Sequence, residues 1–419
     1  MFLTFLLTVP FQTRIIYNKP QALIGDTVSY YLAIMVYLSD LLFVSALLSW
    51  LFTDFNKSFA KSRVFWLCLL AAAFPLISVF HVQQMGLFLF GWLKWVELMA
   101  IIVYISCNFN RKSEILGIYW VVFLSGIFQA VIAILQFHVQ HGLGLTWLGE
   151  YVSPLGTPGL ATIDVLGQKV LRAYGTFSHP NVLAGFLTVS FIAGLDLVSR
   201  GTIRTKLFVS LGILTLIFGL FLSFSRAAWL AAALSTIAYF YQFLKTRNYL
   251  TAKIMTILLI VSCGTIWLGF HDFIVSRATD LNNSKAVSYR TDFNAQAVTI
   301  WRQYPFTGAG LNNYVPALET MKPGLAGWQY QPPHNIFLLL GVETGIIGSL
   351  LLLVLVGFLV RFTWNRKTEH SFLVLTCLAS FVILGLFDHY LLTIQQGMLM
   401  LGLILGLAAI LPEQANEVK

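Results

Sequence analysis

Three segments of this sequence contain an arginine or a histidine that can bind an anion or accept a proton. Arg226 lies in SFSRAAWL, between two apolar runs. Arg290 lies near the start of SYRTDFNAQAVTIWRQYP, and His334 begins the long apolar run HNIFLLLGVETGIIG. A guanidinium binds phosphate oxygens through two parallel hydrogen bonds, and a neutral imidazole accepts a proton. These residue types suit a reaction with an anionic leaving group and a hydroxyl that must be deprotonated.

Arg226 allows two interpretations. It falls in a tight turn at, or just inside, the predicted membrane interface, where a charge is costly without a partner. Its side chain either extends to the lipid headgroups or binds an anion. We favour the anion because the fork of the guanidinium matches phosphate.

Arg290 opens a predicted helix that Pro305 and the turn residues of FTGAGLNN end. Arg290, Asn294, Ala297 and Trp301 share one face of that helix, because they are spaced 4, 3 and 4 residues apart. The face either presents a cation and an aromatic ring to a ligand or packs the helix onto the membrane surface. The spacing supports both equally.

His334 follows two prolines, so we place it in the first turn of a membrane helix. The helix dipole favours a neutral imidazole there. Gly341, Gly345 and Gly348 fall within about 40° of His334 at roughly 100° per residue. We predict that this glycine stripe lets a neighbouring helix approach closely beneath the histidine. Glu343 falls on the opposite side and is expected to be a buried structural residue or a residue of a polar cavity.

Further polar residues lie near the ends of other predicted membrane helices. His179 precedes Pro180 in RAYGTFSHPNVLAGF, and Arg172 lies seven residues earlier. A structural role at the interface explains His179 at least as well as a functional one. Asp388 and His389 fall in the turn between the last two apolar runs and are a candidate acid–base pair.

Several signatures of nucleotide and metal chemistry are missing from the sequence. It contains no Walker A loop, GxGxxG, HExxH, GxSxG or DxD pair. The four cysteines lie in or at the ends of apolar runs without a CxxC pair, so neither a disulfide framework nor a zinc site is indicated. We expect no metal and no cofactor.

The composition predicts an all-α integral membrane protein. Of 419 residues, 58% are hydrophobic and only 10% are charged. Twelve spans of about 20 residues would occupy roughly 240 positions. The net charge of +9 is explained by basic loops on the cytoplasmic side, so we expect membrane lipids and no nucleic acid as partners. Residues 1–419 are interpreted as one polytopic membrane domain.

Basic residues also predict the orientation in the membrane. The predicted spans cover residues 2–17, 30–52, 64–81, 85–107, 114–138, 180–198, 206–223, 226–244, 252–270, 334–360, 371–388 and 391–411. With both termini in the cytoplasm, five short inner loops contain fourteen basic residues, whereas the two long outer loops, 139–179 and 271–333, contain seven. All candidate site residues then face outward. Because no nucleotide is available there, any reaction must use a substrate that is already activated.

The segment that begins at His334 resembles the signature of the bacterial O-antigen ligase and polymerase superfamily. His334, Asn335, Gly345 and Gly348 fill the positions of that signature. SRAAWLAAAL and YRTDFNAQAVTIWRQYPFTGAGLNNY resemble the two arginine-bearing segments of the superfamily in the same order, and RAYGTFSHPNVLAGF resembles a further common segment. The resemblance covers about residues 170–360, including the outer loop 271–333.

The resemblance implies a GT-C-like membrane glycosyltransferase that uses neither a metal nor a nucleotide. It would transfer a glycan from a polyprenyl (undecaprenyl) diphosphate carrier to an acceptor hydroxyl, outside the bacterial cytoplasmic (inner) membrane. Arg226 and Arg290 would bind the diphosphate, and His334 would be the catalytic base. Arg172, His179 and Asn335 would be secondary residues, and an apolar groove would hold the polyprenyl chain.

Several activities remain open. An O-antigen ligase transfers the glycan to a lipid, a polymerase to another carrier-linked glycan, and an oligosaccharyltransferase to a protein hydroxyl. The motifs do not separate these, and we favour the ligase. A transporter or flippase for lipid-linked sugars would use the same arginines to bind phosphate. Internal repeats and broken helices, which are common in transporters, are not visible in the sequence.

Overall fold

The structure is a computed structural model that describes all residues except 20, 25–26, 54–61, 153, 158, 280–284, 368–369 and 411–419. The helices are Phe2–Thr8 (α1), Leu38–Thr53 (α2), Arg63–Ala73 (α3), Met85–Asn108 (α4), Lys112–Val139 (α5), Pro180–Val198 (α6), Ile203–Leu222 (α7), Arg226–Lys245 (α8), Tyr249–Thr279 (α9), Lys285–Gln303 (α10), Tyr314–Met321 (α11), Ile336–Arg366 (α12), Ser371–Phe387 (α13), Tyr390–Thr393 (α14) and Gln395–Ala409 (α15). Three 3-10 turns cover Phe74–His81, Thr146–Leu148 and Gly327–Gln329.

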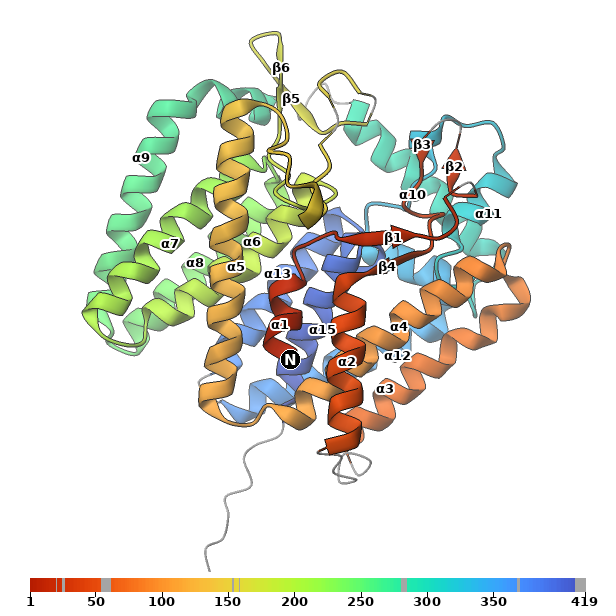
Figure 1. The fold of residues 1–419 in the computed structure, drawn as a ribbon, viewed down its shortest axis with the longest axis horizontal. Helices are drawn as coiled ribbons and strands as arrows, with labels where there is room; N and C mark the ends of the chain where they lie inside the picture. Colours follow the sequence, from red (N-terminus) through yellow and green to blue (C-terminus); the bar gives the residue numbers. More distant parts are fainter. Residues whose placement is uncertain are drawn as a thin grey trace, which may run out of the picture.

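Short antiparallel hairpins complete the chain. They pair Arg14–Ile16 (β1) with Met35–Tyr37 (β4), Leu23–Ile24 (β2) with Thr27–Val28 (β3), and Thr162–Val165 (β5) with Gln168–Leu171 (β6). The hairpins lie at the same end of the molecule as α10 and α11 (Figure 1). We call this end, at the top of Figure 1, the hairpin end.

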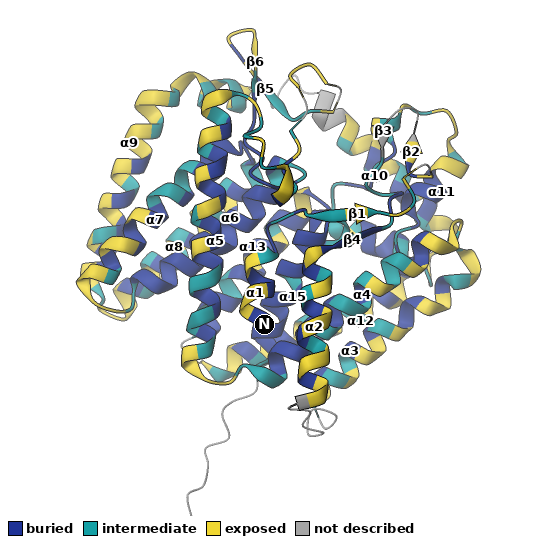
Figure 2. Cartoon of the chain, viewed as in Figure 1, coloured by how far each residue is buried: buried dark blue, intermediate teal, exposed yellow. Residues whose placement is uncertain are grey.

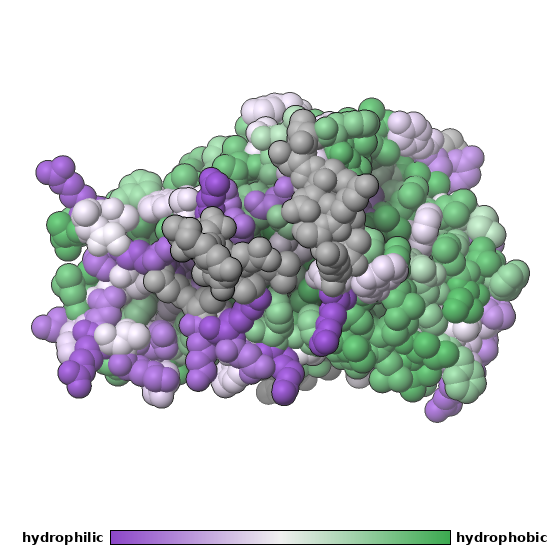
Figure 3. Space-filling model, turned by 90° about the horizontal axis from the view of Figure 1, so that it is seen from below, coloured by the Kyte–Doolittle hydropathy of each residue, from purple (hydrophilic) through white to green (hydrophobic). Residues whose placement is uncertain are grey.

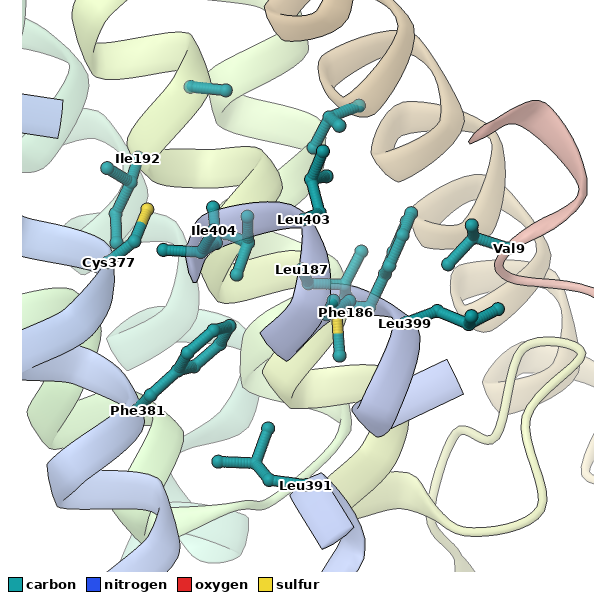
Figure 4. Packing of buried hydrophobic residues seen from close by; sticks show 14 of the residues in the cluster. Val9, Phe186, Leu187, Ile192, Cys377, Phe381, Leu391, Leu399, Leu403 and Ile404 are labelled. Atoms are coloured by element: carbon teal, nitrogen blue, oxygen red, sulfur yellow. The ribbon is translucent and has the colours of Figure 1, made fainter. Parts of the chain in front are cut away.

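Helix α6 forms the centre of the fold. Its apolar window is 94% buried, because α5, α7, α8, α13 and α15 all pack against it. In the core, Leu187 and Ile192 of α6 lie among side chains from α13 and α15 (Figure 4). By contrast, α9 is mostly exposed along its length (Figure 2). A peripheral apolar helix of this kind needs a lipid environment, because its outward side chains have no protein to pack against.

The helical membrane architecture predicted from the composition is confirmed. Among the described residues, eight helices are long and apolar enough to cross a membrane, and α2, α13 and α15 are shorter apolar helices. The predicted helix over 2–17 is wrong, because α1 ends at Thr8 and the chain then enters β1. The predicted helix over 30–52 begins only at Leu38, after β4, and the last predicted helix is divided into α14 and α15.

The two ends of the helical bundle differ in charge. The α4–α5, α6–α7 and α8–α9 connections lie at the end opposite the hairpins (Figure 1). They and the adjoining helix ends contain basic side chains, namely Arg111, Lys112, Arg200, Arg204, Lys206, Lys245, Arg247 and Lys253. Viewed from that end, hydrophilic side chains gather over the half of the surface that lies below α7, α8 and α9 (Figure 3). This is the basic end of the molecule.

Helix α12 is broken at Gly345. The glycine has φ 65° and ψ −175°, which no helix contains, so two helical segments meet there at a kink. The loop after α10 fills the break, because the Ile346 amide donates to the Pro305 carbonyl at 2.9 Å and the Ala309 amide to the Val342 carbonyl at 2.8 Å. The predicted stripe of Gly341, Gly345 and Gly348 on one regular helix is therefore wrong, since regular periodicity does not continue past Gly345.

The segment predicted as the second long outer loop is largely helical. Helix α9 continues nine residues past the predicted boundary at 270, to Thr279, after a non-helical residue at Phe270. The helix predicted around Arg290 is confirmed as α10, and it packs against α12. These extensions bring the ends of α9 and α10 toward the candidate site.

Candidate functional site

A cavity of about 450 Å³ opens at the hairpin end of the bundle, where α6, α8, α9, α10 and α13 meet. Four arginines and one carboxylate line it. The full lining consists of Arg172, Asn181, Ser225, Arg226, Ala227, Leu230, Arg277, Arg290, Leu384, Phe387, Asp388 and Tyr390. The excess of positive charge favours an anionic ligand in this cavity.

Arg226 and Arg290 meet in this cavity, as a shared role in anion binding requires. Arg226 is the first residue of α8, and its Nη1 atom is buried without a hydrogen-bond partner among the described residues. An unpaired buried donor is rare in proteins, and a phosphate oxygen would satisfy it. Arg290 extends from α10, and burial lowers its pKa, as does the charge of Arg226, whereas Asp388 raises it.

The other residues predicted on the face of Arg290 have a different role. Ala297 is fully buried between α10 and its neighbours, and Trp301 lies beside Gly341 of α12. This part of the face packs α10 onto α12 and presents no aromatic ring to the cavity. Arg290 thus reaches the cavity without the predicted aromatic partner, and the rest of the face packs on α12 rather than on the membrane surface.

Arg172 is buried and held by two hydrogen bonds. It follows β6, and its Nε donates to the Ser223 carbonyl at 2.7 Å while Nη2 donates to Asn181 Oδ1 at 2.7 Å. Burial, together with the charge of Arg277, lowers the pKa of Arg172 to about 9. An anion in the cavity would favour the charged form of Arg172, which burial disfavours.

Arg277 is the cavity arginine that the sequence did not single out. It lies in the last turn of α9, and its Nε donates to the Phe224 carbonyl at 3.2 Å. The sequence did offer one indication, because Arg277 is one of the few basic residues in the predicted outer loops. Because the helix was expected to end near residue 270, nothing indicated that Arg277 lines the same cavity as Arg226.

His334 lies beside the cavity, next to Asp388. The distance from His334 Nδ1 to Asp388 Oδ1 is 3.6 Å, which suits an ion pair when the imidazole is protonated. His334 stands two residues before the first residue of α12, so the prediction that it lies inside the first turn is wrong. The cap is Asn335, whose Oδ1 accepts from the amides of Phe337 and Leu338. Asn335 therefore fixes the start of α12.

The side chains of Asp388 and His389 are close but hydrogen-bond to other groups. Asp388 Oδ2 accepts from Asn181 Nδ2 at 2.6 Å, and Oδ1 accepts from the backbone amide of His389 at 2.8 Å. Burial alone would raise the pKa of Asp388, but the adjacent His334, together with His389 and His179, lowers it well below the ordinary value. His389 Nδ1 lies 2.8 Å from Thr393 Oγ1, and burial lowers the pKa of His389 to about 3.

His179 is the N-cap of α6. Its Nδ1 accepts from the backbone amide of Asn181 at 3.1 Å. Burial, with the neighbouring charge of Arg172, lowers the pKa of His179 to about 3, so its imidazole is neutral at physiological pH. The structure thus gives His179 the structural role that the sequence left open, at the edge of the site.

His334, Asp388 and His389 also form a cluster with the chemistry of a metal site. One ligand atom from each lies within 4.8 Å of the others. Imidazole nitrogens and a carboxylate are ligands that zinc accepts. Sequence spacing gave no sign of this cluster, because the ligands come from two distant segments.

The arrangement combines two chemical functions within one region. The four arginines offer guanidinium donors to a phosphate or diphosphate, and the adjacent His334–Asp388 pair offers a base with a carboxylate that favours the protonated imidazole. Together they can stabilise a phosphate leaving group and accept a proton from a nucleophile.

Comparison with known proteins agrees with the residues at this site. No curated protein gives a match to the chain. Residues 211–353 match the sequence model of a family described as O-Antigen ligase, and this range lies within the segment 170–360 that carries the motifs. The match covers the helices of Arg226, Arg277 and Arg290 and the start of α12 after His334. It confirms the resemblance to the O-antigen ligase superfamily over residues 211–353, and the eight candidate spans among the described residues indicate a multi-pass membrane protein.

Proposed function

We propose that this protein is a membrane glycosyltransferase that moves a glycan from a polyprenyl (undecaprenyl) diphosphate carrier to an acceptor hydroxyl. The observation that carries the proposal is the cavity in which Arg172, Arg226, Arg277 and Arg290 gather beside the His334–Asp388 pair. The family match supports this class of enzyme. A diphosphate leaving group needs positive charge, and a hydroxyl nucleophile needs a base.

In the proposed reaction, the acceptor oxygen attacks the anomeric carbon of the glycan. The bond between that carbon and the diphosphate oxygen breaks, and its electron pair leaves with the diphosphate. The proton of the acceptor hydroxyl passes to His334. Because Asp388 faces Nδ1, the neutral tautomer with its proton on Nδ1 is favoured, which leaves Nε2 to act as the base.

The arginines would stabilise the charge that develops on the departing diphosphate. Arg226 supplies a buried donor without a partner, and Arg290 lies close enough for the two charges to influence each other. Donors placed in advance at such a position contribute about 2–4 kcal/mol each to the transition state. This positive charge takes the place that a metal ion has in other diphosphate chemistry, so we propose that the reaction needs no metal.

The apolar side of the cavity would receive the carrier. Ala227 and Leu230 of α8 and Leu384 and Phe387 of α13 line it opposite the arginines. Leu230 and Phe387 are each nearly half exposed, at 47% and 46%, which fits side chains that contact a lipid chain. The isoprenoid would thus enter between α8 and α13 while its diphosphate meets the arginines.

The distribution of basic residues supports the orientation of the site. The basic end would face the cytoplasm with both termini, and the hairpin end with its cavity would face outward. In a bacterium this is the outer surface of the inner membrane, where the acceptor is a lipid or a glycan. We favour the ligase activity over the polymerase and the protein oligosaccharyltransferase.

A reconstituted assay tests the proposal. Purified protein in liposomes would receive an undecaprenyl diphosphate-linked oligosaccharide together with a lipid A-core acceptor, a second carrier-linked glycan or a peptide with free hydroxyls. We expect release of the carrier diphosphate and extension of one acceptor, which then names the activity. Movement of the intact lipid-linked sugar across the bilayer without transfer would instead show a flippase.

A further inference from the structure

We infer that Asn181 is a positioning residue that holds the Asp388 carboxylate against His334. This inference rests on the proposed function, because it assigns Asn181 a role in the transfer reaction. Asn181 lies at the start of α6 and was not singled out by the sequence, since the neighbouring His179 carried the expected chemistry. The structure places its side-chain amide between a cation and a carboxylate of the cavity.

Both polar atoms of the Asn181 side-chain amide form hydrogen bonds. Its Oδ1 accepts from Arg172 Nη2 at 2.7 Å, and its Nδ2 donates to Asp388 Oδ2 at 2.6 Å. Asp388 Oδ1 then lies 3.6 Å from His334 Nδ1. The amide orientation follows from these partners, because Arg172 can only donate and an ionised Asp388 can only accept. The result is a chain from Arg172 through Asn181 and Asp388 to His334.

Arg172 and Asn181, the first two residues of this hydrogen-bonded series, are fixed by elements that do not contribute the His334–Asp388 pair. Arg172 is held by the Ser223 carbonyl, in the turn between α7 and α8. Asn181 belongs to α6, the most buried helix of the bundle. The backbone amide of Asn181 also donates to His179 Nδ1, which fixes the first turn of that helix. The Asp388 carboxylate is therefore oriented by the rigid core of the protein.

An amide suits this position better than a second cation. A direct ion pair with an arginine would bring positive charge against Asp388 and draw the carboxylate away from His334. Asn181 supplies a neutral donor and keeps Arg172 one residue away. The carboxylate retains its charge for His334, while the arginines of the cavity remain directed toward an anionic ligand.

A double-mutant cycle on kcat tests the inference. The variants are Asn181→Ala, Asp388→Asn and the double variant, measured in the reconstituted transfer assay. We expect Asn181→Ala to lower kcat about 10- to 100-fold and to change the donor KM less than threefold. If Asn181 acts through Asp388, the double variant has the kcat of Asp388→Asn alone. Losses that multiply in the double variant would overturn the inference.

A second substitution, Asn181→Asp, tests the inference even if the alanine variant does not fold. Asn181→Asp has nearly the same shape and can still accept from Arg172, but it cannot donate to Asp388 while ionised. We expect it to be as slow as Asn181→Ala. Transfer by Asn181→Asp at the wild-type rate would also overturn the inference.

The control is Gln396→Ala. Gln396 is a fully buried amide whose Nε2 donates to the Phe11 carbonyl at 3.0 Å, away from the chain to His334. We expect this variant to lose stability but to keep its kcat per folded molecule. If Asn181→Ala behaved in the same way, its role would be structural only. Wild-type protein without any transfer would instead refute the proposed function, and the inference with it.

Discussion

Gly345 and Phe306 meet backbone to backbone, at the point where the loop after α10 fills the break in α12. A Cβ atom on residue 345 would lie 2.2 Å from the Phe306 carbonyl oxygen, and the positive φ of Gly345 disfavours any side chain. The contact joins the helix that contains Arg290 to the helix that follows His334. The position of Arg290 relative to His334 therefore depends on Gly345.

We expect Gly345→Ala to lower the free energy of unfolding by at least about 2 kcal/mol and to reduce transfer in the protein that still folds, because Phe306 must move. Thermal unfolding in detergent, followed by the reconstituted assay, measures both effects. The matched control is Gly357→Ala in the same helix, where a Cβ would meet nothing within 4 Å. Equal stability of the two variants would show that the contact at Gly345 is not rigid.

His334→Ala should abolish transfer while the protein is still expressed and inserted in the membrane. The reason is that no acceptor proton can then be removed at the site. Release of the carrier diphosphate from the lipid-linked glycan is the measurement. His271→Ala, at an exposed position on α9, is the control and should transfer normally. Normal transfer by His334→Ala would refute the assignment of the base.

Arg226→Ala and Arg290→Ala should each lower kcat/KM for the donor by about 10²–10³, since each removes a donor to the developing negative charge. Lysine at either position should recover only part of this loss, because it cannot bind bidentately. Arg277→Ala should also weaken transfer. Arg302→Ala, which alters an exposed side chain of α10, provides the control. An unchanged rate in Arg290→Ala would remove this arginine from the proposed site.

Acid should destabilise the protein below about pH 6.5. His179 has a folded pKa of about 3, whereas an unfolded histidine has about 6.5, so between these values only the unfolded state takes up the proton. The loss from this histidine is about 1.4 kcal/mol per pH unit. His179→Asn keeps an acceptor at the N-cap and should flatten the dependence of Tm on pH between 7.5 and 4.5. His138→Asn, which alters an exposed histidine, is the control and should keep the wild-type slope. If His179→Asn had the same slope as wild type and this control, the explanation would be contradicted.

Zinc ions should inhibit transfer reversibly, and EDTA alone should leave the activity unchanged. The imidazoles of His334 and His389 and the Asp388 carboxylate are close enough to bind zinc, and a bound ion would prevent His334 from taking a proton. Activity would be measured against zinc concentration with and without the chelator. His389→Gln should require more zinc for the same inhibition. Loss of activity in EDTA alone would show that the enzyme needs a metal.

The sequence predicted the class of fold and the main residues of the site, because both depend on local patterns. Apolar runs mark the helices, and the residues around Arg226, Arg290 and His334 match motifs with fixed spacing. The prediction failed where tertiary contacts decide the structure. The helix expected over residues 2–17 ends at Thr8, and α12 breaks at Gly345, although both segments are mainly apolar.

The contacts among the other site residues could not be predicted from one sequence. Arg172 and Asn181 lie nine residues apart, whereas Asp388 lies in a distant segment, and their hydrogen bonds depend on how α6, α7, α8 and α13 pack. Periodicity describes one helix at a time and gives no relative placement of helices. For the same reason Asp388 was paired with its sequence neighbour His389, although its Oδ1 faces His334.

The site is divided between the matched family region and the rest of the chain. Residues 211–353 contain three of the cavity arginines and His334, whereas Arg172, Asn181 and Asp388 lie outside this range. A chimera that received only residues 211–353 from a relative would combine a foreign base with the resident carboxylate. Transplanting substrate preference between such proteins will therefore require exchange of the segments around residues 172–181 and 384–390 as well.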